Sequence, residues 1–305
     1  METAAPLRAA TLGKGKVWRP VWRVVRIVLL VYLGVALVLS RFQARLIFPG
    51  AETKGRPEAA FDPPPDCSLV ALRAAGGERV MALFGPALGE RGEPLADAEE
   101  RPTLIYFYGN GMCLRDALDE FQRFRRLGAN VLAPEYVGFG LSEGDPSEAG
   151  CYATADAAYD YLVNRPGIDR TKIVPAGWSL GAAVAIDLAA RRQVAGLATF
   201  SAFTSMVDMA QRQFPFLPIS LLLRHRFDSE KKIATIDAPI LIGHSRDDTL
   251  IPHTMADRLE RAVPKGQVTR VNVDGADHNE FFAVGAGKIF PALQQFLQRL
   301  SRPGR

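Results

Sequence analysis

The chain has 305 residues, 48% of them hydrophobic, and a formal net charge of +4 at pH 7. Residues 1–26 hold six basic side chains against Glu2, a net of +5, so the remaining chain has −1 and lacks the electrostatic footprint of a nucleic-acid-binding protein. Three cysteines, Cys67, Cys113 and Cys151, are an odd number without metal-ligand spacing, which argues against a disulfide framework or a metal site.

An uncharged apolar run, residues 27–40, follows the basic residues. Counted from Val21 it has 20 residues, enough as a helix to cross the ~30 Å hydrocarbon core of a bilayer. It has three interpretations: a cleaved signal peptide, a buried core helix or a retained signal-anchor. No convincing small-x-small cleavage site precedes Arg41, and the run lacks the polar face of a core helix. We therefore expect a transmembrane signal-anchor over residues 21–40.

The basic residues before this run predict the orientation of the chain. By the positive-inside rule, residues 1–20 are a cytoplasmic tail of a single-pass membrane protein, although Arg41 and Arg45 weaken the bias. Residues 41–305 then form one folded domain on the non-cytoplasmic side.

The folded domain is expected to be α/β. Apolar, β-branched runs alternate with helical patterns, which favours a mostly parallel sheet flanked by helices. Helices are predicted over residues 114–127, 152–164, 180–192, 255–263 and 286–300.

The first candidate for the site follows the apolar run 104–108, which predicts a strand. The chain continues as Gly109-Asn110-Gly111-Met112, and the glycines let the backbone approach a ligand closely. The backbone N–H of Asn110 is a candidate donor to a negatively charged oxygen. Read alone, the same residues fit an ordinary Asn-Gly turn.

The second candidate is Gly177-Trp178-Ser179-Leu180-Gly181, between an apolar run at 173–176 and a helix-like segment at 182–190. Strand, G-x-S-x-G and helix together form a nucleophile elbow, in which flanking glycines permit a sharp turn and the serine hydroxyl projects from the strand end. The N–H of Leu180 is the second expected oxyanion donor. The alternative is a glycine-rich turn with a bystander serine.

A serine nucleophile needs a base, and the base needs an acid, in the chain order Ser, Asp or Glu, His. The strand-like run 239–243 leads to Asp247 and Asp248, of which Asp248 is preferred and Asp247 is the fallback. The alternating run 268–273 leads to His278. Each of the three groups therefore lies just beyond a strand end.

The other three histidines have simpler interpretations. His225, between two arginines, is expected to be solvated; His244 ends a strand and is expected to brace the acid loop; His253 follows a proline and is a candidate helix cap. The segment at 201–238 is too short for a separate lid domain, although one or two helices would fit. Its apolar residues are either ordinary core or the wall of an acyl channel.

With these motifs the chain resembles an α/β-hydrolase, and more narrowly the membrane-anchored, Bem46-like branch that includes ABHD13- and ABHD17-type enzymes. The resemblance rests on residues 108–111, 136–144, 177–181 and 201–205 and on the acid and histidine loops. It implies serine hydrolysis of esters or thioesters with lipid-like acyl groups, without a metal or an organic cofactor. The chain departs from the family at Tyr108 and Glu135, where the family usually has His and often Asp.

The sequence thus predicts an α/β-hydrolase fold with a short lid and an N-terminal transmembrane helix. The expected function is a membrane-anchored serine hydrolase with Ser179, Asp248 and His278 as catalytic residues and Leu180 and Asn110 as the oxyanion hole. Its partners are a small-molecule or lipid acyl substrate and the bilayer. The alternatives are a serine peptidase or acyltransferase with the same residues, and a non-catalytic membrane-tethered binding protein.

Overall fold

The computed structural model describes residues 15–264 and 266–301, apart from the side chains of residues 15–17 and 19. The chain divides after Gln43 into two units, an N-terminal one and one that runs from Ala44 onward. The tail expected over residues 1–20 falls mostly outside the described residues, which begin at residue 15.

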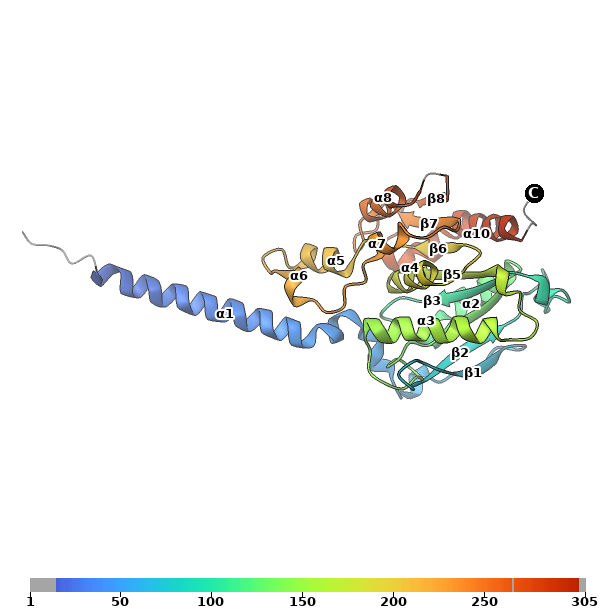
Figure 1. Ribbon diagram of the computed structural model, residues 1–305, viewed down its shortest axis with the longest axis horizontal. Helices are drawn as coiled ribbons and strands as arrows, with labels where there is room; N and C mark the ends of the chain where they lie inside the picture. The colour runs from blue at the N-terminus through green and yellow to red at the C-terminus, as the bar shows by residue number, and fades with distance from the viewer. Residues whose placement is uncertain (1–14, 265, 302–305) are drawn as a thin grey trace, which may run out of the picture. The chain divides into compact units, whose positions relative to one another are not determined.

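The N-terminal unit is built on one long helix, α1 (Gly15–Ile47), whose last residues belong to the second unit (Figure 1). The helix begins before and ends after the expected span of 21–40. Its apolar side chains are largely exposed, with Leu30 61% and Leu37 70% accessible, so α1 is not a core helix. The part Pro20–Ile47 is long and apolar enough to cross a membrane, and it is a candidate membrane span.

The second unit contains an eight-stranded sheet in the order β1-β2-β4-β3-β5-β6-β7-β8 (Figure 1). Strands β1, β2 and β4 pair antiparallel, and all other neighbours pair parallel. The parallel strands therefore end at the same edge of the sheet, where loops of α/β proteins form their sites. The strands are β1 (Ser68–Arg73), β2 (Arg79–Gly85), β3 (Thr103–Phe107), β4 (Asn130–Pro134), β5 (Ile173–Trp178), β6 (Leu197–Phe200), β7 (Ile240–Ser245) and β8 (Val268–Val273).

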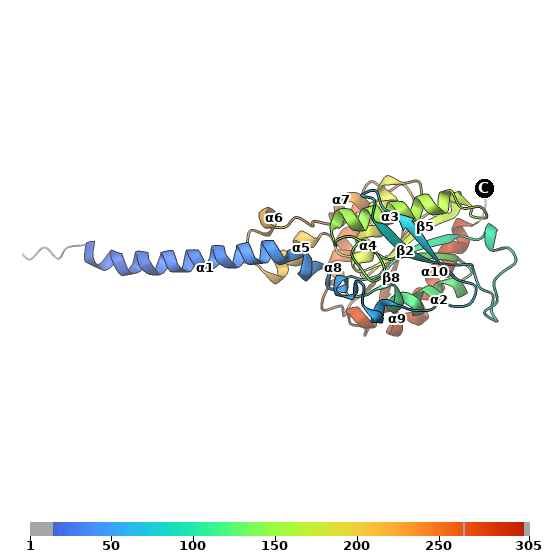
Figure 2. The same ribbon diagram turned by 90° about the horizontal axis from the view of Figure 1, so that it is seen from below.

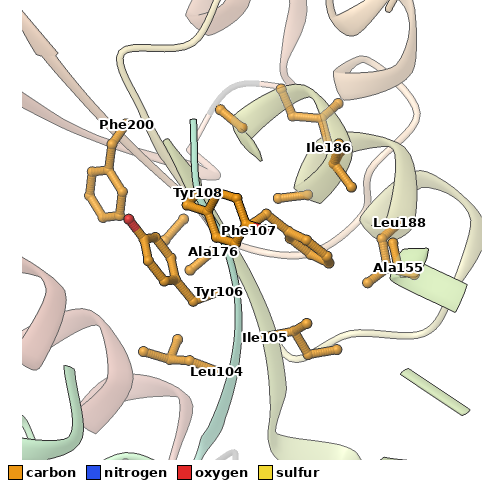
Figure 3. Packing of buried hydrophobic residues seen from close by; sticks show 14 of the residues in the cluster. Leu104, Ile105, Tyr106, Phe107, Tyr108, Ala155, Ala176, Ile186, Leu188 and Phe200 are labelled. Carbon is orange, nitrogen blue, oxygen red and sulfur yellow. The ribbon is translucent and has the colours of Figure 1, made fainter. Parts of the chain in front are cut away.

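The central strands are apolar because both faces of the sheet are covered. Every residue of β3 and β4 is buried. Side chains of β3 alternate: Tyr106 lies on the side of Phe200, and Phe107 lies on the side of Ile186 (Figure 3). On the first side, the ring of Phe124 packs edge-on against Tyr106 at 4.9 Å between centroids.

Helices form a layer on each face of the sheet. Figure 2 shows α3 and α7 on one face and α2, α9 and α10 on the other. Around the sheet the helices are α2 (Leu118–Arg126), α3 (Glu148–Val163), α4 (Leu180–Arg191), α8 (His253–Ala262), α9 (Phe281–Val284) and α10 (Ala286–Leu300). Short 3-10 turns are η1 (Pro49–Thr53), η2 (Pro57–Ala59), η3 (Ala98–Glu100), η4 (Leu114–Ala117), η5 (Arg170–Lys172) and η6 (His278–Glu280).

Two of the expected helices start differently in the structure. Helix α3 begins at Glu148, four residues before the expected start, because the Ser147 hydroxyl caps it by accepting a hydrogen bond from the Gly150 N–H at 2.9 Å. The helix expected over residues 114–127 opens with the 3-10 turn η4 before α2 begins.

The segment at 201–238 holds three short helices, so the expectation of one or two was wrong. They are α5 (Met206–Gln213), α6 (Ile219–Leu222) and α7 (Ser229–Ile233). Its apolar residues are of two kinds: Leu217 and Ile219 are buried, whereas Leu221 is 83% exposed. Part of this lid is therefore core, and part of it faces outward.

Candidate active site

Ser179 lies between β5 and α4 in a backbone conformation that side-chain-bearing residues rarely adopt, with φ 57° and ψ −118°. The turn at Ser179 is possible because Gly177 and Gly181 have no side chains. A Cβ on Gly177 would lie 2.1 Å from the Gly181 carbonyl oxygen, and one on Gly181 would lie 1.9 Å from the carbonyl oxygen of Phe107. The strand and the helix therefore meet closely, as a nucleophile elbow requires.

The structure brings Ser179, His278 and Asp248 together in one hydrogen-bonded series. His278 Nε2 lies 3.0 Å from Ser179 Oγ, and His278 Nδ1 lies 2.7 Å from Asp248 Oδ2. All three residues are buried, with no more than 7% of any of them exposed. An Nδ1–H that donates to the carboxylate leaves the Nε2 lone pair free to accept the serine proton.

The neighbouring acidic residues have separate hydrogen-bond partners. Asp248 Oδ1 accepts from the backbone N–H groups of Leu250 at 3.0 Å and Ile251 at 2.7 Å, which fixes its second oxygen toward His278. Asp247, the fallback acid of the sequence, instead accepts from the Gly275 N–H at 2.6 Å. The geometry therefore favours Asp248 over Asp247 as the partner of the imidazole.

His244, in β7, contacts the loop that carries Asp248. Its ring is fully buried, and Nε2 donates to the Ile251 carbonyl oxygen at 2.8 Å. Burial lowers the pKa of His244 to about 4, so the ring is neutral at physiological pH. The bracing role expected for this residue fits its position.

The acid and histidine loops are tied directly to each other. Asp277 accepts from both the N–H and the hydroxyl of Thr249, at 3.0 and 2.8 Å. The Ser245 hydroxyl donates to the Ala276 carbonyl oxygen at 2.6 Å. These bonds hold the loops of Asp248 and His278 at a fixed separation.

The two remaining histidines lie elsewhere. His225 is half-buried rather than solvated: its Nδ1 accepts from the Glu148 N–H at 3.3 Å and its ring packs edge-on against Phe48. The expectation of a solvated His225 was therefore wrong, because the lid returns to the domain at this point. His253 is the first residue of α8, with Pro252 at the cap position.

The two expected oxyanion donors lie on segments that touch. Leu180 is the first residue of α4, where the N–H has no carbonyl partner within the helix and the helix dipole favours negative charge. Asn110 follows β3, and the loop passes close to the elbow because Gly109 lies against the Trp178 ring. Across the described residues, the Asn110 N–H donates no hydrogen bond.

A buried carboxylate holds the loop that carries Asn110. Glu135 is fully buried and accepts from the Tyr108 hydroxyl, from the Leu114 N–H at 2.9 Å and from the Leu141 N–H at 3.2 Å. Burial raises the pKa of Glu135, and the three donors oppose that rise. The two departures from the family pattern, at 108 and 135, are thus partners of each other.

Sequence reasoning assigned no role to Glu135, although a signal was present. It is the one charged residue in the otherwise apolar stretch 131–137. A lone charge in a buried strand end requires hydrogen-bonded partners.

Trp178 was also missed. Its ring stacks on the His278 imidazole at 5.1 Å between centroids and an interplanar angle of 26°. An aromatic face beside this ring favours the positively charged imidazolium. The indole therefore lies against both the His278 imidazole and the loop at Gly109.

The cysteines do not have the features of a thiol nucleophile. All three are free, and burial raises the pKa of the Cys113 thiol to about 11, so it stays protonated at neutral pH. In the described ranges 15–264 and 266–301, no group of three or more His, Cys, Asp or Glu residues is arranged to hold a metal ion.

The mostly parallel sheet, the elbow after β5 and the loops after β7 and β8 define an α/β hydrolase. The sequence model of the alpha/beta hydrolase family matches residues 106–232. The uncharacterized protein Rv2307c of Mycobacterium tuberculosis is 33% identical over 277 residues, which cover 90% of this chain and 94% of the relative. The chain belongs to the α/β-hydrolase family.

Within that family the chain is a homologue of Bem46. Protein bem46 of Schizosaccharomyces pombe is 32% identical over 220 residues, or 70% of this chain and 72% of the relative. Among solved structures, the esterase Pf2001 of Pyrococcus furiosus superimposes with a TM-score of 0.61 at 18% identity, covering 80% of this chain and 95% of that one. At this identity the likeness to the esterase shows the shared fold.

Proposed function

We propose that this protein is a membrane-anchored serine hydrolase that cleaves carboxylic esters or thioesters through an acyl-enzyme on Ser179. The observation that carries the proposal is the buried series Asp248–His278–Ser179, with contacts of 2.7 and 3.0 Å. Membership of the α/β-hydrolase family supports it.

In the first half of the reaction, His278 Nε2 accepts the proton of Ser179 Oγ as the oxygen attacks the substrate carbonyl carbon. Asp248 holds the ring through Nδ1 and stabilises the imidazolium. The N–H groups of Leu180 and Asn110 donate to the oxyanion. When the intermediate collapses, the alcohol or thiol leaves with the proton from Nε2.

In the second half, water attacks the acyl-enzyme while Nε2 takes its proton, and the same oxyanion site holds the second tetrahedral intermediate. The free acid leaves, and the proton returns to Ser179 Oγ. Every step uses side chains and backbone groups of this chain, without a cofactor or a metal.

Substitution of Ser179 by Ala tests the proposal. Because the nucleophile is lost while the oxyanion donors remain, hydrolysis of p-nitrophenyl esters should fall by about 10⁴-fold or more. Labelling by a fluorophosphonate probe should disappear with it. Unchanged turnover in the purified variant would exclude the mechanism.

The substrate class is proposed to be lipid-like. A short lid and a candidate membrane span favour acyl chains presented near a bilayer. A series of p-nitrophenyl esters and matched thioesters of rising chain length, with an aminoacyl amide beside them, measures the preference. Faster turnover of the amide than of every ester would point to the peptidase alternative.

The anchor is proposed to place the N-terminus in the cytoplasm and the hydrolase unit on the other side. The exposed apolar surface of α1 supports the anchor, and the basic residues before residue 27 support this orientation. Protease added to the outside of sealed, right-side-out vesicles should digest the hydrolase unit. Complete protection of the hydrolase unit from the protease would indicate the opposite orientation.

A further inference from the structure

The chain that leaves the apolar helix binds the oxyanion loop directly. Ile47 is the last residue of α1, and its carbonyl oxygen accepts a hydrogen bond from Asn110 Nδ2 at 2.9 Å. The N–H of Gly50 donates to the Asn110 carbonyl oxygen at 2.8 Å. The side chain and the carbonyl of Asn110 are therefore both held by the segment 47–50.

The contact is too close for a side chain at residue 50. A Cβ on Gly50 would lie 2.5 Å from the Met112 carbonyl oxygen, 2.8 Å from that of Asn110 and 2.6 Å from the ring of Phe139. Two of these atoms belong to the backbone of the oxyanion loop and cannot rotate away. Any side chain here must displace either the segment or the loop.

The turn η1 is itself fixed to the hydrolase unit. Thr53 Oγ1 donates to the Gly50 carbonyl oxygen at 2.6 Å and accepts from the Gly140 N–H at 3.1 Å. Phe48 is 1% exposed and packs edge-on against Phe139 and Phe227, at 6.4 and 6.1 Å between centroids. Residues 47–53 are thus a well-packed part of the hydrolase unit and not a loose linker.

We propose that residues 47–53 are a positioning element of the active site, which holds the loop 109–112 so that the Asn110 N–H points at the oxyanion. The inference rests on the proposed function for its catalytic meaning. The side-chain Nδ2 and the backbone carbonyl oxygen of Asn110 are bound by this segment, and the backbone N–H remains for the substrate. Because the segment directly follows the candidate membrane span, a change at the exit of that helix reaches the oxyanion loop through two hydrogen bonds.

The test compares Gly50→Ala and Thr53→Val with the wild type, each as the full chain in phosphatidylcholine nanodiscs. Loss of one oxyanion donor costs about 10²–10³-fold in kcat, so its displacement should lower kcat for p-nitrophenyl butyrate by about 10–10²-fold. KM should stay within about twofold, because the donor acts in the transition state. Thr53→Ser keeps the hydroxyl and should recover most of the activity.

The control is Gly34→Ala, in α1, where a Cβ meets no atom within 4 Å. It should leave kcat unchanged. If Gly50→Ala does not fold, the pair Thr53→Val and Thr53→Ser decides. Folded variants with wild-type kcat would overturn the proposal.

A second measurement separates this inference from the proposed function. Amide hydrogen exchange of residues 109–112 should be faster in Thr53→Val than in the wild type, whether or not the protein turns over an ester. Exchange at the wild-type rate would overturn the inference. A wild type that neither reacts with a fluorophosphonate nor cleaves any ester or thioester would overturn the proposed function alone.

Discussion

The loops that hold Asp248 and His278 differ from the loop that holds Asn110 in where their support comes from. The acid and histidine loops follow neighbouring strands and bind each other, through Thr249 with Asp277 and Ser245 with Ala276. The loop that carries Asn110 is instead held by Glu135, which accepts from the Leu114 N–H, and by Ile47 of the segment 47–53, which accepts from Asn110 Nδ2. The acid and histidine loops therefore support each other, whereas the loop of Asn110 depends on the end of β4 and on the segment 47–53.

This difference predicts two kinds of mutational effect. Changes in the acid and histidine loops alter the proton relay itself. Changes at residues that support the oxyanion loop alter transition-state stabilisation without removing any group of the relay.

The largest expected effect in the relay is that of Asp248→Asn. The amide can no longer orient and stabilise the imidazolium, so kcat should fall by about 10³–10⁴-fold. The matched control is Asp247→Asn, which alters only the bond to the Gly275 N–H and should change kcat by a few-fold at most. Steady-state kinetics on a short ester measure kcat for both variants. A larger loss of kcat in Asp247→Asn than in Asp248→Asn would identify Asp247 as the acid.

On the oxyanion side, Glu135→Gln should lower kcat by about 10–10²-fold, with KM little changed. An amide has one acceptor oxygen in place of two, so the buried N–H of Leu114 or Leu141 loses its partner. The free energy of unfolding should fall by about 1–3 kcal/mol.

The matched control is Glu143→Gln, whose carboxylate forms an exposed ion pair with Arg79. It should change the free energy of unfolding by less than about 1 kcal/mol. If Glu135→Gln and its control change kcat and the free energy of unfolding equally, Glu135 does not support the loop.

The same contrast explains what could be predicted from the sequence. Ser179, Asp248 and His278 each follow an apolar strand, and parallel strands end at one edge, so their meeting followed from pattern and order. The supports of Asn110 lie far from it in sequence: 63 residues separate it from Ile47. Hydrophobic periodicity does not encode which distant backbone groups will pair.

The fold shows a similar division. The parallel sheet agrees with the expectation, and three of the five expected helix starts lie within two residues of those in the structure, because periodicity and strand runs decide them. The start of α3 at Glu148 depended on a single capping side chain, Ser147. The three short lid helices have too few turns for a clear periodic signal.

The smallest expected effect concerns stability rather than turnover. The folded pKa of His244 is about 4, below the ordinary value of about 6.5, so the unfolded chain binds more protons between these values. The stability that neutral His244 contributes is complete above pH 6.5 and is lost as the pH falls toward 4.

Urea unfolding in detergent at pH 7 and pH 4.5 measures this loss. The non-titrating variant His244→Gln should show a shallower pH dependence than the wild type. Equal slopes for the two proteins would mean that His244 is not kept neutral by burial.

The most direct test of the account is the structure of the fluorophosphonate adduct. The phosphorus should be bonded to Ser179 Oγ, and its oxygen should lie about 2.7–3.1 Å from both the Leu180 and the Asn110 backbone nitrogens. Such an adduct would show that Ser179, Asp248 and His278 act together with the loop of Asn110 in one site. Phosphonylation of another residue, or an oxygen turned away from Asn110, would contradict it.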